Sequence, residues 1–207
     1  MRIAVFGATG TVGRHVVEQA LERGHEVTAF TRDPGRVARS HERLRVVRGD
    51  VADPAAVDRA VAGQDAVVVA LGAGRKGRVR ADGTAAVIAA MDRAGTRRLV
   101  VQSTLGAGDS RANLNFLWKR IMFGLLLREA YADHQLQEEH VRRSDLDWTI
   151  VRPGAFTDGP RTGAYRRGFG PEDRSTRLKI SRADVADFLL EQLTDEGNLH
   201  RTPAVSY

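Results

Sequence analysis

The chain has no cysteine among its 207 residues, which excludes disulfide bonds, thiolate chemistry and cysteine-ligated metal sites. It also has no apolar run that approaches the roughly 20 residues of a membrane span. Its first residues lead directly into a strand-like segment, Arg2–Phe6, and not into the apolar core of a signal peptide. We therefore expect a cytoplasmic protein with no membrane partner.

Acidic side chains are the smaller charged group: 26 Asp and Glu stand against 32 Lys and Arg, for a formal net charge of +6. A basic surface can attract nucleic acid or a phosphorylated small molecule. The arginines are scattered in short clusters, and no helix-turn-helix or RNA-stacking pattern accompanies them. The charge balance suits either kind of ligand, and because no nucleic-acid-binding pattern accompanies it we predict no nucleic-acid partner.

Patterns that ligate metals are also missing. His134 and His140 are six residues apart, a spacing that does not place them on one helix face, and no third ligand accompanies them. We interpret both as surface residues, together with His15, His25 and His41. The sequence predicts no metal site.

The sequence does contain a regular alternation of short apolar runs and amphipathic stretches. Several runs are apolar at consecutive positions, as strands buried on both faces of a parallel sheet are. This alternation predicts an α/β fold, a single Rossmann-type doubly wound parallel sheet, in one domain over residues 1–207. The expected strands are Arg2–Phe6, Glu26–Thr31, Leu44–Arg48, Ala66–Leu71, Arg98–Gln102 and Trp148–Val151, and the expected helices are Val12–Arg23, Ala55–Ala62, Ala81–Ala94, a long one between Leu114 and Arg143, and Arg182–Leu193.

Three local patterns predict where helices begin and end. Gly24 is placed to terminate the first helix, and Asp53-Pro54 puts an N-cap residue before a proline in the first helical position. Ser181 and Asp184 resemble a capping box. We therefore expect these residues to set the ends of three different helices.

The glycine-rich segment that follows the first strand is a candidate dinucleotide site. It lies between a strand and a helix, where Gly7 allows a tight turn, Gly10 lets a pyrophosphate approach, and Gly13 lets the helix pack closely. The start of that helix also offers free N–H groups to phosphates. The expected cofactor-binding residues here are Gly7, Thr9, Gly10, Thr11, Val12 and Gly13.

The end of the second strand favours NADP(H) over NAD(H). NAD sites place an acidic residue there for the ribose 2′-hydroxyl, whereas NADP sites use arginine for the 2′-phosphate. Here Arg32 ends the strand and Arg36 is close enough to join it, so two guanidinium groups could clamp a phosphate. Asp33 leaves an alternative open, because it could pair with Arg36 in a solvated loop.

Two further strand ends lie at the same expected edge of the sheet. Asp50 and Val51 follow the third strand, and Leu71, Gly72 and Ala73 follow the fourth. Such positions would line the adenine and the ribose–phosphate chain. Asp50 has an equally good interpretation as a residue that starts a helix and binds no ligand.

Candidate catalytic residues are few. Classical short-chain dehydrogenases use a tyrosine and a lysine four residues later, but Tyr131 is followed at that spacing by Gln135 and Tyr165 by Phe169. Ser103 and Thr104 end the fifth strand and are placed to touch the nicotinamide ribose or the substrate. Local hydrogen bonding to the backbone is an equal alternative for both.

Two later segments have more than one interpretation. The irregular stretch of about 154–178 carries glycines, prolines and aromatics, and we expect it to face the substrate, with Tyr165 stacking on a flat acceptor. The stretch 116–127 is denser in apolar side chains than one helix face needs. Core packing is the favoured interpretation of it, and a lid or an oligomer surface is the alternative.

The sequence resembles the atypical short-chain dehydrogenases, and within them the NADPH-dependent flavin reductase and biliverdin-IXβ reductase group. The resemblance runs along nearly the whole chain. Its more specific parts are Ala62–Ala66 and Gly163–Tyr165. The other matching segments are Gly7–Gly13, Thr31–Asp33 with Arg36, Val47–Val51, Thr162, Ile180-Ser181 and Ser206-Tyr207.

The resemblance implies a monomer that uses NADPH to reduce a flavin such as FMN or a linear tetrapyrrole. Family binding positions carry over at Gly10, Thr11, Gly13, Arg32, Arg36, Asp50, Val51, Leu71 and Gly72, and we add Ser103 and the loop Pro153, Gly154, Ala155 and Phe156. In that loop the animal enzyme of the group has a histidine after the proline. This chain has Ala155 there, which cannot supply a proton, so we expect the proton to come from solvent. A non-catalytic NADP(H) sensor is the main alternative, and reduction of a quinone or an isoflavone-like carbonyl is a third.

Overall fold

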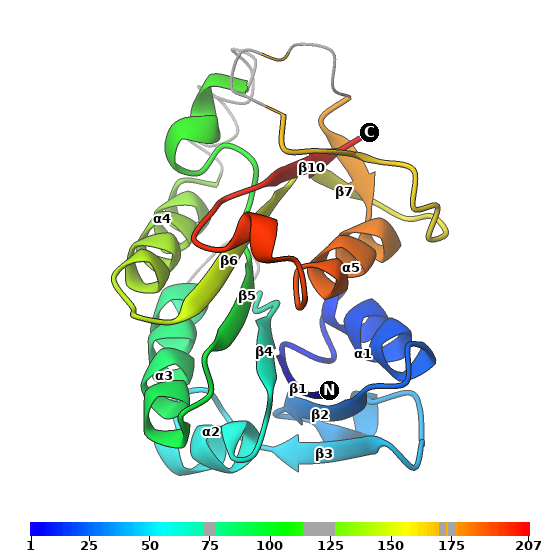
Figure 1. Cartoon of the computed structure of the whole chain (residues 1–207), viewed down its shortest axis with the longest axis vertical. Helices are drawn as coiled ribbons and strands as arrows, with labels where there is room; N and C mark the ends of the chain where they lie inside the picture. Colours follow the sequence, from blue (N-terminus) through cyan, green and yellow to red (C-terminus); the bar gives the residue numbers. More distant parts are fainter. Residues whose placement is uncertain (73–77, 114–126, 170–172, 174–176) are drawn as a thin grey trace.

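The computed structural model describes residues 1–72, 78–113, 127–169, 173 and 177–207. Its main sheet has eight strands in the order β3-β2-β1-β4-β5-β6-β10-β8, and a separate pair joins β7 to β9 (Figure 1). The strands are β1 (Arg2–Phe6), β2 (Glu26–Thr31), β3 (Leu44–Arg48), β4 (Ala66–Val69), β5 (Arg98–Gln102), β6 (Asp147–Pro153), β7 (Ala155–Thr157), β8 (Arg166–Arg167), β9 (Lys179–Ser181) and β10 (Ala204–Ser206). The α-helices are α1 (Gly13–Glu22), α2 (Pro54–Val61), α3 (Val79–Ala94), α4 (Arg128–Arg142) and α5 (Arg182–Glu191).

The predicted doubly wound sheet is confirmed. Neighbouring strands from β3 to β10 run parallel, and β8 pairs antiparallel with β10 at the far edge. The chain builds outward from β1 in one direction through β2 and β3, and then in the other direction from β4. In such sheets the point where the order reverses, here between β1 and β4, opens a crevice at the carboxyl ends of the strands.

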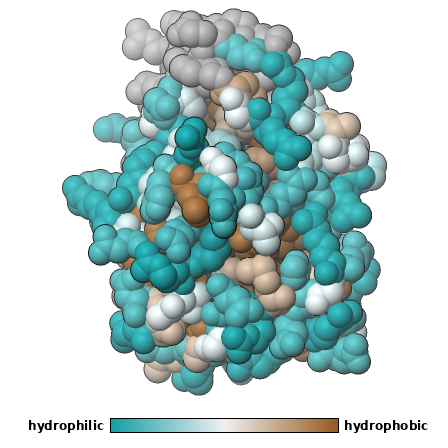
Figure 2. All heavy atoms as spheres, in the orientation of Figure 1, coloured by the Kyte–Doolittle hydropathy of each residue, from teal (hydrophilic) through white to brown (hydrophobic). Residues whose placement is uncertain are grey.

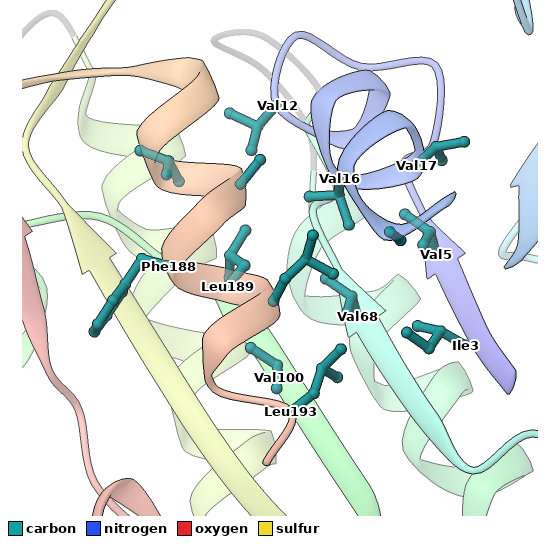
Figure 3. Packing of buried hydrophobic residues seen from close by; sticks show 14 of the residues in the cluster. Ile3, Val5, Val12, Val16, Val17, Val68, Val100, Phe188, Leu189 and Leu193 are labelled. Atoms are coloured by element: carbon teal, nitrogen blue, oxygen red, sulfur yellow. The ribbon is translucent and has the colours of Figure 1, made fainter. Parts of the chain in front are cut away.

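Each central strand has two buried faces. Ile3 and Val5 pack on the side of α1 and α5, whereas Ala4 and Phe6 pack on the side of α2, α3 and α4. The same alternation continues along β4 and β5. Figure 3 shows the first of these two cores, with Val16 of α1 and Leu189 of α5 directed toward the sheet. This two-sided burial is why the strands are apolar at consecutive positions.

The predicted helix ends are confirmed by hydrogen bonds. Gly24 adopts φ +82° just after α1, and its N–H donates to the carbonyl of Leu21 at 3.0 Å. Asp53 caps α2 by accepting from the N–H of Ala55, with Pro54 in the first helical position. Ser181 caps α5 by accepting from the N–H of Asp184 at 3.0 Å. Side-chain caps therefore begin α2 and α5, and a glycine in the left-handed conformation follows the end of α1, where the sequence indicates.

The structure adds four short strands that the sequence did not predict. β7 and β8 lie inside the stretch of 154–178 that was predicted to be irregular, and β9 and β10 follow it. Each has two or three residues, too few for an alternating pattern, and each exists because a distant segment offers backbone partners. Of the long helix predicted between residues 114 and 143, the described part is α4; residues 114–126, and with them most of the apolar stretch 116–127, lie outside the described residues.

The face of the molecule in Figure 2 is mainly hydrophilic, with apolar side chains visible in the gaps near its middle. Among the helices that the structure describes, none combines the length and the apolar character that crossing a membrane requires.

Candidate active site at the switch point of the sheet

A cavity of about 620 Å³ lies at the carboxyl ends of the central strands, where the strand order reverses. It brings together residues from the loops after β1, β2, β3, β4 and β5, and from α3, α4 and β7. Its predicted site residues are Gly7, Thr9, Gly10, Thr11, Val12, Arg32, Arg36, Asp50, Val51, Leu71, Gly72, Ser103, Thr104 and Phe156. Gly13, Pro153, Gly154 and Ala155 do not line it, and Ala73 lies outside the described residues.

The glycine loop has close contacts that only glycine permits. Gly7 adopts φ +85°, and a Cβ placed there would lie 2.3 Å from the carbonyl oxygen of Ala70. A Cβ on Gly13 would lie 2.0 Å from the carbonyl oxygen of Gly7, so the start of α1 is pressed against the loop. Gly13 therefore does not touch the cavity, but it lets the start of α1 pack closely against the glycine loop.

The start of α1 fits a phosphate group. Unlike α2 and α5, α1 has no side-chain cap. Among the described residues, none accepts a hydrogen bond from the backbone N–H of Thr11 or Val12, and both residues line the cavity. Uncapped N–H groups and the positive end of the helix dipole favour an anion at this position. The residues present thus fit the pyrophosphate of a dinucleotide.

Two arginines, Arg32 and Arg36, lie at one end of the cavity, and their side chains make few interactions with the described residues. The Arg32 side chain is 79% exposed, and its nearest carboxylate oxygen, on Asp50, is 4.0 Å away. Arg36 also borders the cavity. Asp50 itself accepts from the N–H of Ala52 at 2.9 Å, so it both stabilises a turn and lines the cavity. Exposed ion pairs at this distance contribute little, which leaves both guanidinium groups able to bind a phosphate.

Asp33 does not pair with Arg36. Its carboxylate accepts from the backbone N–H of Gly35 at 3.1 Å, and its own N–H donates to Thr31 Oγ1 at 3.2 Å. The aspartate thus stabilises the turn that presents the two arginines. The alternative in which Asp33 neutralises Arg36 is wrong.

The opposite end of the cavity is buried and densely hydrogen-bonded. Ser103 Oγ donates to Glu138 Oε1 at 2.7 Å. Arg152 donates to both oxygens of the same carboxylate, from Nε at 2.9 Å and from Nη2 at 2.7 Å, and its Nη1 bonds Asp109. The Glu138 and Arg152 side chains are each 1% exposed. This network ties β5, α4 and β6 together beneath Ser103.

Glu138 is held ionised by that network. Burial opposes its charge, but the hydrogen bonds and charge of Arg152 and the hydrogen bond from Ser103 hold the pKa of the carboxyl below its ordinary value. Thr104 is less constrained, with Oγ1 3.4 Å from the carbonyl oxygen of Leu105. For Ser103 the alternative of local backbone bonding is wrong, because its hydroxyl bonds a side chain 35 residues away.

The interpretation of His134 as a surface residue is also wrong. Its side chain is buried, at 8% exposure, and borders the cavity from α4. Burial, and then the charge of Arg80, lower the pKa of His134 to about 4, so the imidazole is neutral at pH 7. The sequence held a signal, since Ala130, His134, Gln137 and Val141 follow helical spacing and form a buried face. The other four predicted surface histidines are partly exposed.

Sequence reasoning missed Arg80 as well. It lines the cavity beside His134, and its Nη1 donates to Asp133 Oδ2 at 3.2 Å. Asp133 also accepts from the backbone N–H groups of Arg80 and Ala81, so a residue of α4 caps the start of α3. No local pattern reveals this contact, because the two helices meet only in the fold.

Tyr165 does not face the cavity, which corrects the predicted stacking. Its ring packs edge-on against Phe188 with centroids 5.8 Å apart, and its hydroxyl donates to Asp187 at 2.8 Å. Asp184 holds the same loop by accepting from the N–H groups of Thr162 and Gly163. The loop is therefore fastened to α5, and its aromatic ring belongs to the core.

Two phenylalanine rings line the cavity within the described residues: Phe30 of β2, which is buried at 3% exposure, and Phe156 of β7. Phe156 is 37% exposed, and the guanidinium of Arg182 lies 5.6 Å from its centroid. A partly exposed aromatic ring at the mouth of a cavity suits a flat apolar ligand. Within the described residues, no group of three or more His, Asp or Glu side chains is arranged to hold a metal ion.

Comparison with known proteins places the chain in a family. Residues 7–196 match the family described as NAD(P)H-binding. The chain is 31% identical over 210 residues to the UPF0659 protein YMR090W of Saccharomyces cerevisiae, covering 93% of this chain and 87% of that protein. It is 32% identical over 216 residues to a (4-alkanoyl-5-oxo-2,5-dihydrofuran-3-yl)methyl phosphate reductase of Streptomyces griseus, covering 99% of this chain and 67% of that protein.

A similar solved structure is ChuY of Escherichia coli O157:H7, described as an anaerobillin reductase. It has a TM-score of 0.82 and 26% identity, and the match covers all of this chain and 97% of that one. The cavity at the switch point, the glycine loop and the uncapped start of α1 agree with the family match. The chain belongs to the NAD(P)H-binding family, and its fold is that of NAD(P)H-dependent oxidoreductases.

Proposed function

We propose that the protein is an NADPH-dependent reductase that reduces a planar, conjugated acceptor. The acceptor class is a flavin such as FMN or a linear tetrapyrrole of the biliverdin type, and the proton comes from solvent. The observation that carries the proposal is the asymmetry of the cavity, which has Arg32 and Arg36 at one end and the open ring of Phe156 with buried polar groups at the other.

The residues suggest how NADPH would be held. Arg32 and Arg36 would bind the 2′-phosphate, since within the described residues Arg32 has only the 4.0 Å contact with Asp50 and Arg36 has no ion pair to break. The loop from Gly7 to Gly13 and the start of α1 would hold the pyrophosphate. Asp50, Val51, Leu71 and Gly72 would line the adenosine portion. When bound, the reduced nicotinamide supplies a hydride to the acceptor.

The acceptor would lie between the nicotinamide position and Phe156. The exposed ring offers a stacking surface to a flat molecule. Ser103 already donates its hydrogen to Glu138, and His134 is neutral at pH 7, so neither is a ready proton donor. Both observations favour water as the proton source, with the protein mainly positioning the two reactants. The reductases named above add independent support for the reaction class.

A purified sample mixed with NADPH tests the proposal through the absorbance of reduced nicotinamide. We expect oxidation of NADPH on adding FMN or biliverdin, a slower reaction with NADH, and less activity with a simple quinone. Tight NADPH binding without oxidation by any acceptor would instead favour the alternative, a non-catalytic NADP(H) sensor of the same fold. The cytoplasmic location and the monomeric state stay predictions, and size-exclusion chromatography tests the second.

A further inference from the structure

Ser103 lines the cavity, and its hydroxyl hydrogen is already used in a hydrogen bond to Glu138. The residue is 1% exposed, and its Oγ donates to Glu138 Oε1 at 2.7 Å. A hydroxyl has one hydrogen and two acceptor lone pairs. With that hydrogen used, only lone pairs remain for a ligand in the cavity.

Glu138 cannot donate a hydrogen bond to Ser103, because both oxygens of its carboxylate act as acceptors. Oε1 accepts from Ser103 and from Arg152 Nε. Oε2 accepts from Arg152 Nη2 and from Arg142 Nη2, both at 2.7 Å. An ionised carboxylate has no hydrogen to give, so the direction of the Ser103–Glu138 bond is set. Arg152, itself 1% exposed, prevents the carboxylate from turning away.

We propose that Ser103 is an acceptor-only contact for the nicotinamide half of the cofactor, and that Glu138 is the positioning residue that sets this polarity. Ser103 would accept from a hydroxyl of the nicotinamide ribose or from the amide N–H of the carboxamide, which are the donors that half carries. The inference rests on the proposed function, because it assumes that the dinucleotide lies along the cavity with its nicotinamide at this end. It also means that Ser103 is a binding residue and not the source of the proton.

The test compares a probe that occupies one end of the cavity with a probe that occupies both ends. Adenosine 2′,5′-bisphosphate carries only the half expected at Arg32 and Arg36, whereas NADPH carries both halves. Affinities are measured by calorimetry for the wild type, Ser103→Ala, Glu138→Gln and the double variant. Glu139→Gln is the matched control, since the neighbouring glutamate pairs with Arg143 in an exposed position.

Glu138→Gln should reverse the hydrogen bond. Its amide nitrogen would oppose one arginine N–H at the Oε1 position but two at the Oε2 position. The amide nitrogen therefore takes the Oε1 position and donates to Ser103, whose hydrogen then points to the ligand. The Ser103 hydrogen then faces the carboxamide N–H, or a ribose hydroxyl that has to turn to accept it, and binding should weaken toward the level seen when the Ser103 hydroxyl is absent.

We expect Ser103→Ala and Glu138→Gln each to weaken NADPH binding by about three- to tenfold, the worth of one hydrogen bond. Binding of adenosine 2′,5′-bisphosphate should not change, and it also shows that each variant is folded. In the double variant the loss should equal that of Ser103→Ala alone, because Glu138 acts through Ser103. The pH dependence of kcat should be the same in Ser103→Ala as in the wild type.

Unchanged NADPH affinity in Ser103→Ala would overturn the inference, and so would fully additive losses in the double variant. If Glu138→Gln does not fold, Ser103→Ala decides alone, since it leaves the carboxylate with its arginine partners. A wild type that binds neither probe contradicts the proposed function itself, whereas a wild type that binds both with an unaffected Ser103→Ala contradicts only this inference.

Discussion

The two ends of the cavity are built in opposite ways. At the end where we propose that the adenine half of the cofactor binds, Arg32 and Arg36 project from a turn into solvent, and the Arg32 guanidinium lies 4.0 Å from a carboxylate oxygen of Asp50. At the opposite end, where we propose that the nicotinamide half binds, Ser103, Glu138 and Arg152 are 1% exposed and joined by hydrogen bonds of 2.7–2.9 Å. One end is held by a few consecutive residues, and the other by three separate elements of the fold.

This difference separates binding from stability. Exposed charges contribute little to folding and remain available to a ligand. Buried charges are costly to leave unpaired, so changing one member of the network affects the whole fold. Substitutions at the adenine end should therefore change affinity alone, and those at the nicotinamide end should also change the free energy of unfolding.

The largest expected effect is on stability, from Arg152→Leu. The substitution leaves the Glu138 carboxylate buried without its main partner, and such losses cost about 3–5 kcal/mol of unfolding free energy. Urea denaturation followed by circular dichroism measures it. Arg143→Leu is the control, because Arg143 pairs with Glu139 on the exposed side of α4 and its loss should cost less than about 1 kcal/mol. An equal loss of unfolding free energy in the two variants would mean that the buried network is no more important for stability than an exposed ion pair.

The next effect is on cofactor choice, from the double variant Arg32→Ala/Arg36→Ala. Removing two charge-assisted partners of the 2′-phosphate should weaken NADPH binding by about 100-fold or more, with NADH binding and stability unchanged. Fluorescence titration of both cofactors measures the ratio. Arg39→Ala serves as the control, since Arg39 bonds Glu18 and does not line the cavity. An equal loss for NADH would mean that the arginines do not recognise the 2′-phosphate.

His134 should make stability depend on pH. Its pKa is lowered to about 4, chiefly by burial and then by Arg80, against the opposing charges of Asp133 and Glu138 and a contact with Gln137. In the unfolded chain the His134 imidazole takes up a proton near pH 6.5, whereas in the folded chain it does so only near pH 4. The free energy of unfolding therefore falls as the pH drops from about 6.5 toward 4.

Between pH 7 and pH 5, His134→Leu should lose about 2 kcal/mol less unfolding free energy than the wild type. Denaturation curves at both pH values measure this difference. His140→Leu, on the same helix and partly exposed, should follow the wild type. Parallel losses in wild type and His134→Leu would show that the imidazole is not held neutral.

The smallest effect concerns the acceptor. Phe156→Leu removes the aromatic face at the cavity mouth, and the KM for FMN or biliverdin should rise by about three- to tenfold, as expected for one stacking contact. NADPH affinity should stay the same. Val46→Ala, another exposed apolar residue on β3, is the control and should change neither quantity. A raised Kd for NADPH with an unchanged KM for the acceptor would move Phe156 to the cofactor side.

Sequence reasoning succeeded where the signal is local. The glycine loop, the Asp53-Pro54 helix start and the two arginines after β2 all lie within short segments, and the structure places each as expected. It failed where contacts join distant segments. Tyr165 was predicted to face the substrate and packs on α5, and His134 was predicted to be exposed and lines the cavity.

The sequence by itself determined the doubly wound sheet, because consecutive apolar residues can be buried only when helices cover both faces of each strand. It also determined the loop at which we propose that the phosphates bind, because a strand, a glycine turn and a helix follow one another directly. The tertiary structure alone decided the buried, hydrogen-bonded end of the cavity. Ser103 and Glu138 are 35 residues apart, and only the packing of α4 against β5 and β6 makes a hydroxyl of one strand donate to a carboxylate that an arginine of another strand holds in place.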